Sequence, residues 1–460
     1  MLLEKTGKKF YLGSIALWSV LIAVFLSAPY VYSLVRSNLA VYGSSTSWFL
    51  ILPGIVFTVM GLFYLLFSAI LAYIYKPCPK QKPEDRPGCT VIVPAYNEGR
   101  HVAETLYSLL ECDYPADKLE IIAINDGSKD DTWSWILEAA RHSNGRIAPI
   151  NLAKNGGKKH ALYCGILAAK HEIIVTVDSD SIVEKDAIAN LVAPFQDPEV
   201  GGVAGNIRIK NLREGALPVM MDIGFMFGFE IIRSAHSIIG SVMCTPGALS
   251  GYRRSTILPH LDEWLEQKFL GVPATIGEDR AISSIILRNG HKVLFQSNAI
   301  AYTCVPSDYP KFCKMLLRWT RSDIRENWVM FKYAFGSFEL PDFCRIGLQI
   351  NLMAQILNIM MPLFYFPSMI YFLVFYPQCF GGILYINIVM GLICGAIPAL
   401  IYARRYSLTD SIWAFVFSIY NLFALSWINV YSIFTVRNSN WLTRELPGRK
   451  SRVILPTPTA

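Results

Sequence analysis

Four long stretches of this sequence carry no charged side chain, and they limit the folds that are open to the chain. They are residues 11–35, 47–75, 346–403 and 411–436. An α-helix needs about 20 apolar residues to cross a bilayer, so each stretch is long enough to span one and the third is long enough for two crossings. Since 53% of all residues are hydrophobic, we expect a multi-pass membrane protein.

The basic residues beside these stretches predict their orientation. Lys5, Lys8 and Lys9 precede the first stretch, whereas the loop that follows it offers only Arg36. Basic loops stay inside, so the N-terminus and the polar middle of the chain are expected in the cytoplasm, beneath the plasma (inner) membrane. This orientation divides the chain into segments: 1–76 with two transmembrane helices, a 77–88 linker, an 89–335 catalytic domain, a 336–436 membrane region and a 437–460 cytoplasmic tail.

The tail conflicts with a simple count of crossings. Three crossings after the catalytic domain would place the tail outside, but "RNSNWLTRELPGRKSR" contains five basic residues and should lie inside. We therefore expect residues 411–436 to re-enter or to lie along the interface, with a break near 425–427.

The net charge and the cysteines exclude other classes of protein. The charge of +7 is concentrated beside the membrane stretches. The sequence contains no basic stripe interleaved with aromatic residues, so it does not indicate a nucleic-acid partner. The ten cysteines form no CxxC pair and have no spacing typical of a metal site, so reduced, buried thiols are expected.

The polar middle alternates strand and helix patterns. Strands are predicted at "CTVIVPAYN", "KLEIIAIND", "RIAPINL" and "HEIIVTVDSD", with helices near 101–111, from about 130 and over 156–170. Strands rich in Ile and Val that alternate with helices predict a Rossmann-like α/β domain with a mostly parallel sheet. Such sheets bind ligands beyond the carboxyl ends of their strands.

Polar side chains follow three of these strands. Asn97 and Glu98 follow the first strand, Asn125 and Asp126 the second, and "DSD" the fourth. In an extended chain, residues two apart point the same way, so Asp178 and Asp180 should converge on one point. Two converging carboxylates suit Mg²⁺ or Mn²⁺ with phosphate oxygens as further ligands. The "NDGSKDDT" loop also allows a simpler role, in which Ser128 or Asp130 caps the next helix.

Seven motifs in order carry a family resemblance: "VIVPAYNE", "NDGSKDD", "GGKKHAL", "VDSDS", "GALSGYRR", "GEDR" and "RWTRS". Over about 89–444 the chain resembles the membrane-embedded, processive family-two glycosyltransferases, and among them hyaluronan synthases and rhizobial chitooligosaccharide synthases. The resemblance implies a uridine-diphosphate sugar donor, a divalent metal ion and an inverting transfer. For the donor site it implies Tyr96, Asn97, Glu98 and Asp126 at the uridine, Lys158 beside the donor, and Asp178 with Asp180 at the metal.

The resemblance also assigns the base and the acceptor site. Asp279 of "GEDR" would take the proton of the acceptor hydroxyl, Arg280 would keep it ionised, and Glu278 is the residue that could be mistaken for it. "CTPGALSGYRR" would cradle the acceptor through Cys244, Gly247, Ser250 and the close backbone approach at Gly251. A surface ion pair for Arg280 and a buried thiol for Cys244 are the simpler alternatives.

A basic helix is expected at "KMLLRWTRSDIREN". Arg318, Arg321, Ser322 and Arg325 recur at helical spacing, so they share one face, for which a solvated surface is the simpler reading. The family pattern QxxRW implies Arg318 at the diphosphate and Trp319 against an acceptor sugar, although Met315 here replaces the Gln. "NWLTR" is similar to the family's W-x-T-R element, so Trp441, Thr443 and Arg444 would close over the donor.

The resemblance implies polymerisation of N-acetylglucosamine from UDP-GlcNAc and translocation of the polysaccharide across the membrane. The expected partners are the UDP-sugar donor, the growing polysaccharide and membrane lipid. Three alternatives stay open at this point: a hyaluronan synthase that also uses UDP-glucuronate, a non-processive transferase to a lipid phosphate, and a nucleotide-binding sensor without catalysis.

Overall fold

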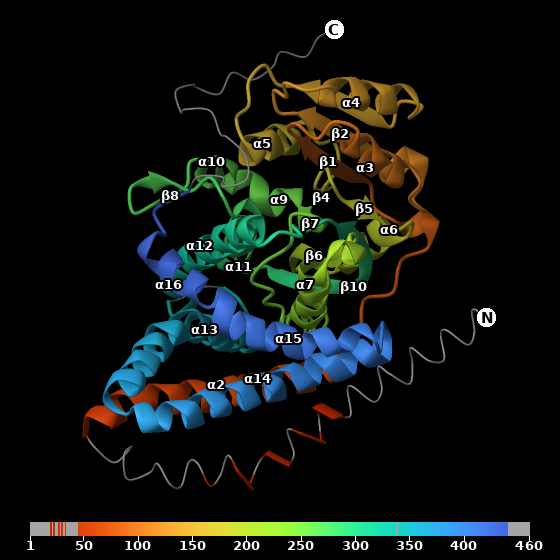
Figure 1. The fold of residues 1–460 in the computed structure, drawn as a ribbon. Helices are drawn as coiled ribbons and strands as arrows, with labels where there is room; N and C mark the ends of the chain where they lie inside the picture. Colours follow the sequence, from red (N-terminus) through yellow and green to blue (C-terminus); the bar gives the residue numbers. More distant parts are fainter. Residues whose placement is uncertain are drawn as a thin grey trace, which may run out of the picture.

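The computed structural model describes residues 45–336 and 339–439, together with a few positions between 19 and 33. An α/β domain lies on one side of a layer of long helices, α2 (Ser45–Ile74), α13 (Asp342–Phe375) and α14 (Pro377–Arg405) (Figure 1). Two shorter helices, α15 (Trp413–Tyr420) and α16 (Trp427–Phe434), run between this layer and the domain. The first uncharged stretch, 11–35, falls largely outside the described residues.

The domain is built on an eight-stranded sheet that is mostly parallel. Its order is β3 (Ile147–Asn151), β2 (Leu119–Asn125), β1 (Cys89–Ala95), β4 (Ile173–Thr176), β7 (Ser250–Arg253), β6 (Val200–Ile209), β10 (Lys292–Thr303) and β5 (Ile182–Val183). Only β7 and β5 pair antiparallel with their neighbours. The expected Rossmann-like, mostly parallel α/β domain is therefore confirmed. A separate hairpin pairs β8 (Lys268–Phe269) with β9 (Val272–Pro273).

Helices cover both faces of this sheet, and its strands β1, β2 and β4 are rich in apolar residues. The helices of the domain are α3 (His101–Leu110), α4 (Thr132–Arg141), α5 (Lys158–Ala168), α6 (Ala187–Val192), α7 (Ala216–Met226), α8 (Ser234–Ile238), α9 (Arg254–Ile257), α10 (Leu261–Leu265), α11 (Glu278–Arg288) and α12 (Tyr309–Ala334). A π-helical segment, Phe227–Arg233, joins α7 to α8. The three helices expected after the first three strands are α3, α4 and α5.

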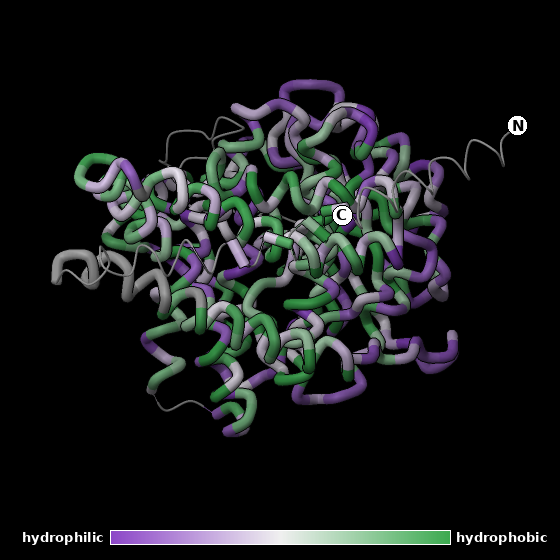
Figure 2. The backbone as a smooth tube through the Cα atoms, turned by 60° about the horizontal axis from the view of Figure 1, so that its bottom comes forward, coloured by the Kyte–Doolittle hydropathy of each residue, from purple (hydrophilic) through white to green (hydrophobic). Residues whose placement is uncertain are grey.

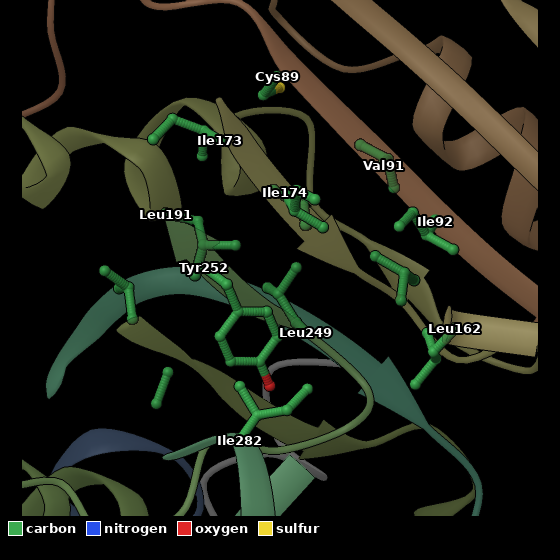
Figure 3. Close-up of a cluster of buried hydrophobic side chains, with 14 of the residues drawn as sticks. Cys89, Val91, Ile92, Leu162, Ile173, Ile174, Leu191, Leu249, Tyr252 and Ile282 are labelled. Carbon is green, nitrogen blue, oxygen red and sulfur yellow. The ribbon is translucent and has the colours of Figure 1, made fainter. Parts of the chain in front are cut away.

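The core fixes the helix that carries the predicted base. All seven residues of β1 are buried. Figure 3 shows Ile92 of β1, Ile174 of β4 and Tyr252 of β7 in one cluster with Leu162 of α5 and Ile282 of α11. Because Ile282 lies about one turn after Asp279, packing in this cluster fixes the start of α11 relative to the sheet.

Among the described residues, three helical stretches are long and apolar enough to cross a membrane: Asp342–Phe375, Phe380–Arg405 and Asp410–Phe434. The long helix α2 also exposes large apolar side chains, with Phe63 65% and Leu66 62% exposed. In Figure 2 hydrophilic stretches lie mostly in outer loops, and hydrophobic stretches run through the helices and inner strands. Extended exposed apolar surface of this kind is what lipid covers, so the protein is a membrane protein.

The last apolar stretch is bent where a break was expected. A π-helical turn, Asn421–Leu425, and Ser426 separate α15 from α16. The carbonyl of Ala424 accepts hydrogen bonds from the hydroxyl of Tyr309 at 2.8 Å and from Nε1 of Trp427 at 2.9 Å. These side chains satisfy a backbone group that a regular helix would pair within itself.

Both ends of this stretch contact the α/β domain. Before it, Arg405 and Tyr406 at the end of α14 bind the carboxylate of Glu230 in the π-helical segment. After it, Oγ1 of Thr435 accepts a hydrogen bond of 2.9 Å from Arg321 of α12. The chain therefore leaves the domain and returns to it within about 30 residues.

Candidate active site

Asp126 ties the end of β2 to the loop before α5. Its carboxylate is 2% exposed and accepts the backbone N–H groups of Gly156 at 2.8 Å and Gly157 at 2.9 Å. Burial raises the pKa of Asp126 to about 6, although these two hydrogen bonds act in the opposite direction. Asp126 thus holds the "NGGKK" loop at the carboxyl edge of the sheet.

The loops after β1 and β2 are fastened to one another. The backbone N–H of Asn97 donates to Oγ of Ser128 at 3.0 Å, and Oδ1 of Asn97 accepts the N–H of Lys129 at 2.9 Å. Asp130 accepts the N–H of Gly99 at 3.1 Å and also that of Thr132 at the start of α4. Ser128 therefore joins the two loops and does not cap the helix, and Asp130 joins them as well and binds Thr132, although the N-cap residue of α4 is Asp131. Tyr96 and Glu98 lie half-buried in the same loop.

Lys158 connects the donor side of the site to α11. It is the first residue of α5, its Nζ pairs with Oδ1 of Asp178, and the same Nζ lies 3.1 Å from Oε1 of Glu278. Burial by itself lowers the pKa of Lys158, but the carboxylates around it raise the pKa above its usual range. The ammonium is therefore a fixed positive charge at the strand end.

Asp178 and Asp180 follow β4 and are both half-buried, with Ser179 buried between them. In the described part of the chain no three His, Cys, Asp or Glu side chains gather as a metal site. The chemistry of the two carboxylates suits a hard divalent ion that takes its other ligands from a diphosphate. Because Lys158 already neutralises Asp178, such an ion would bind this pair best together with the anionic substrate.

The position of Asp279 depends on a glycine. Gly277 has a φ of +80°, and a Cβ there would lie 1.7 Å from Oγ of Ser322 in α12. Only glycine allows this close crossing, which places Glu278 and Asp279 in the first turn of α11. Oδ2 of Asp279 accepts the N–H of Gly247 at 3.1 Å, so the acceptor loop touches the predicted base.

Burial raises the pKa of Asp279 to about 6, and repulsion by the Glu278 carboxylate adds to this rise, whereas Lys158 opposes it. Arg280 was expected to keep Asp279 ionised, and its backbone N–H acts in that direction, because it donates to Oδ1 of Asp279 at 2.8 Å and lowers the pKa of that carboxyl. Its guanidinium points to α12 and α13, where it binds Asp323 at 2.9 Å, Asn327 at 2.7 Å and Gln355 at 2.5 Å. The buried acidic side chain of Glu278, which pairs with Lys158, is a site residue that sequence reasoning did not assign.

The acceptor loop around Gly247 packs against the residues on the donor side of the site. A Cβ at Gly247 would be 2.7 Å from Nζ of Lys158 and 3.3 Å from Oδ2 of Asp178. Ser250 is fully buried and its hydroxyl donates to the carbonyl of Pro246 at 2.5 Å, so in this arrangement it holds the turn. Burial raises the pKa of Cys244 to about 12, so its thiol stays protonated. Gly251 faces Phe195 in the core, which corrects its expected place beside a sugar.

Two arginines of the expected basic face of α12, Arg321 and Arg325, are buried and Arg318 is half-buried, so this face is not a solvated surface. Arg321 is 2% and Arg325 is 3% exposed, and Nη2 of Arg325 donates to the carbonyl of Ile276 at 2.9 Å. Burial raises the pKa of Glu278, but the charge of Lys158 and, to a smaller extent, that of Arg318 lower it below its usual range. The ring of Trp319 lies 6.0 Å from that of Phe225, at 31°.

The surroundings of Met315 explain why it replaces the glutamine of the family pattern. It is buried in an apolar cluster with Leu425 and Ile428 of the bent stretch. A glutamine there would have to leave an amide in apolar surroundings.

The end of the described chain returns to the site. Oγ of Ser439 donates to the carbonyl of Pro273 at 2.7 Å, and Oγ1 of Thr275 donates to the carbonyl of Ser439 at 2.5 Å. These contacts lie just before Gly277 and Asp279, and "NWLTR" follows at once. Trp441, Thr443 and Arg444 themselves lie outside the described residues.

The chain is similar to known glycosyltransferases. Residues 90–258 match the family described as glycosyl transferase family 2. The chain is 29% identical over 363 residues to an N-acetylglucosaminyltransferase of Azorhizobium caulinodans, which covers 78% of this chain and 88% of that protein. It is 27% identical over 442 residues to a hyaluronan synthase of Streptococcus pyogenes, over 93% and 96% of the two chains.

The fold is shared with a solved mannosyltransferase. The structure of this Pyrobaculum calidifontis enzyme, in complex with GDP-Man and Mn²⁺, has a TM-score of 0.59 and 22% sequence identity. The likeness covers 82% of this chain and 98% of that chain.

Proposed function

Since this chain is a membrane glycosyltransferase with a family 2 domain, we propose that it polymerises N-acetylglucosamine from UDP-N-acetylglucosamine by processive, inverting β-transfer. The similarity to N-acetylglucosaminyltransferases over 78% of the chain supports this choice of donor. The proposal places the catalytic domain, residues 89–335, on the cytoplasmic face of the plasma membrane, where nucleotide sugars are made.

One observation carries the proposal. The Lys158 ammonium pairs with Asp178, and Gly247 beside it donates to the carboxylate of Asp279. The residue expected beside the donor diphosphate and the residue expected to act as base are therefore joined through one glycine. In a displacement reaction these two groups must flank a single carbon atom.

The transfer can be written with these residues. Asp279 takes the proton from the acceptor hydroxyl, the hydroxyl oxygen attacks the anomeric carbon from the face opposite the diphosphate, and the bond from that carbon to the diphosphate oxygen breaks. Lys158 and Arg318 stabilise the charge that develops on the diphosphate. A divalent ion held by Asp178 and Asp180, Mg²⁺ or Mn²⁺, would supply further positive charge there.

The remaining donor residues have supporting roles in this proposal. Tyr96, Asn97 and Glu98 would contact the uridine from the loop that Ser128 and Asp130 hold in place, and Asp126 would contact it from the end of β2. Trp441, Thr443 and Arg444 would close over the donor, which is supported by the attachment of Ser439 to the loop that precedes Asp279.

The membrane part would carry the product out. In this proposal α2, α13 and α14 cross the membrane, whereas residues 411–436 lie along the interface, because both ends of that stretch contact the domain. The basic tail then stays inside, as its charge requires. Lipid is a partner along the exposed apolar helices.

A second candidate is hyaluronan synthesis from UDP-GlcNAc and UDP-glucuronate. It is favoured by the likeness to a hyaluronan synthase, which extends over 93% of this chain. A single transfer to a lipid phosphate loses its main support, because the apolar cluster around Met315 accounts for the missing glutamine.

The deciding experiment supplies the purified full-length protein with radiolabelled UDP-N-acetylglucosamine and Mn²⁺, with and without UDP-glucuronate. A long product from one donor that chitinase digests supports the proposal. A product that forms only with both donors and is digested by hyaluronidase supports the second candidate. Absence of UDP release under every condition would contradict both.

A further inference from the structure

Arg233, at the edge of the site, forms no ion pair with the described residues. It is the last residue of the π-helical segment Phe227–Arg233, and π-helical segments are frequent at functional sites. Its guanidinium lies over the ring of Phe229, 3.7 Å from the ring centre. Nη1 is buried, and the described residues offer it no hydrogen-bond partner.

The groups around Arg233 belong to the proposed acceptor site. Asp279, Arg280, Asp323 and the Cys244 thiol all lie close enough for their charges to act on its guanidinium. Asp323 already pairs with Arg280 at 2.9 Å, and Asp279 accepts from the backbone N–H of Gly247. Burial lowers the pKa of Arg233, because the surroundings solvate its charge poorly.

An aromatic row connects Arg233 to Trp319. The rings of Trp319 and Phe225 are 6.0 Å apart, and those of Phe225 and Phe229 are 5.3 Å apart. Arg233 lies over the last ring of this row. The row therefore runs from the tryptophan expected to stack on an acceptor sugar to the unpaired guanidinium.

We propose that Arg233 is a further acceptor-binding residue, which donates a hydrogen bond from Nη1 to a hydroxyl or acetamido oxygen of the acceptor's terminal sugar. The bond holds that sugar against the aromatic row with its reacting hydroxyl toward Asp279. This inference rests on the proposed glycosyl transfer and names one contact that orients the acceptor.

A purely structural role for Arg233 does not account for its buried N–H. A buried donor without a partner destabilises the fold, and such groups in native proteins are usually satisfied by water or a ligand. Arg280, the neighbouring cation, binds Asp323, Asn327 and Gln355 through Nη1 and Nη2, and among the described residues only its Nε lacks a partner. A sugar oxygen provides what the described protein atoms around Nη1 do not.

The test separates transfer to a sugar from transfer to water. Full-length Arg233→Gln and Arg233→Lys are compared with wild type, and Arg213→Gln, at an exposed position of the same domain, is the matched control. Each protein receives UDP-N-acetylglucosamine and Mn²⁺, with increasing concentrations of the N-acetylglucosamine disaccharide as acceptor. UDP release without acceptor measures hydrolysis of the donor, and thermal unfolding checks the fold.

We expect Arg233→Gln to raise KM for the disaccharide about tenfold or more, the scale of one hydrogen bond to a charged group, with donor hydrolysis and KM for the donor within about twofold of wild type. KM of Arg233→Lys for the disaccharide should lie between the values of wild type and Arg233→Gln. If Arg233→Gln does not fold, the KM of Arg233→Lys is the test of the proposal. An unchanged KM for the disaccharide, or an equal loss of hydrolysis and transfer, would overturn the proposal. Failure of the proposed function itself would differ, because wild type would then not release UDP in response to the disaccharide.

Discussion

The backbone N–H of Gly247 donates a hydrogen bond of 3.1 Å to Oδ2 of Asp279, which joins two parts of the chain that lie 32 residues apart. The same glycine leaves room for the Lys158 ammonium, since a Cβ would lie 2.7 Å from Nζ. The contact therefore fixes the distance between the predicted base and the positive charge on the donor side.

Replacement of Asp279 by Asn should abolish turnover and keep donor binding. The amide retains the shape of the side chain and cannot take a proton, and a general base contributes roughly 100-fold or more to the rate. UDP release and binding of radiolabelled UDP measure the two effects. Wild-type polymer yield from Asp279→Asn would show that another group is the base.

Activity should fall on the acid side of about pH 6. Burial raises the pKa of Asp279 to about 6, so its carboxyl is ionised above that pH and protonated below it. Only the ionised form accepts a proton, and kcat should therefore rise tenfold per pH unit up to about pH 6 and then level off. Single-turnover rates over pH 4.5–8 measure this. A profile that stays flat down to pH 4.5 would rule out a base with a raised pKa.

Replacement of Gly247 by Ala should reduce activity by roughly 10- to 100-fold, because the added methyl must push Lys158 away from Asp178. Gly381→Ala is the matched control, since nothing lies within 4 Å of a Cβ there. Polymer yield and thermal unfolding of both variants give the measurement. Equal activity of the two variants would show that the close contact at Gly247 is unimportant.

Restoring the family glutamine at Met315 should destabilise the protein. Met315 is 7% exposed among apolar residues, so the amide of Met315→Gln would be buried there at a cost of about 1–3 kcal/mol in the free energy of unfolding. Met315→Leu should be close to neutral. Thermal unfolding measures both, and a more stable or more active Met315→Gln would show that this position faces the ionic site.

The two ends of the bent stretch should lie on the same side of the membrane. Single cysteines at the exposed positions Thr409 and Asn438 should react with an impermeant maleimide only in inverted vesicles, as should Lys129→Cys on the catalytic domain. Gln378→Cys, at the far end of α14, should react only in right-side-out vesicles. Opposite labelling of Thr409→Cys and Asn438→Cys would show that the stretch crosses.

Much of this organisation follows from the sequence alone. The uncharged stretches require a membrane because their length matches a bilayer, and the Ile- and Val-rich strands require cover on both faces. Asn97, Asp126 and Asp178 follow three neighbouring strands, and the carboxyl ends of parallel strands meet at one edge. Period, length and strand polarity are local properties, so the sequence predicts the sheet and the edge that carries the site.

Tertiary structure decided how the charges pair. Lys158 binds both Asp178 and Glu278, and the guanidinium of Arg280 binds Asp323. The absence of a side chain at Gly277 leaves room for Ser322. Each partner comes from an element distant in the chain, and its approach depends on how α11 and α12 pack on the sheet. No local pattern encodes that approach, because packing sums many weak contacts over the whole core. For the same reason the unpaired guanidinium of Arg233 is visible only in the folded molecule.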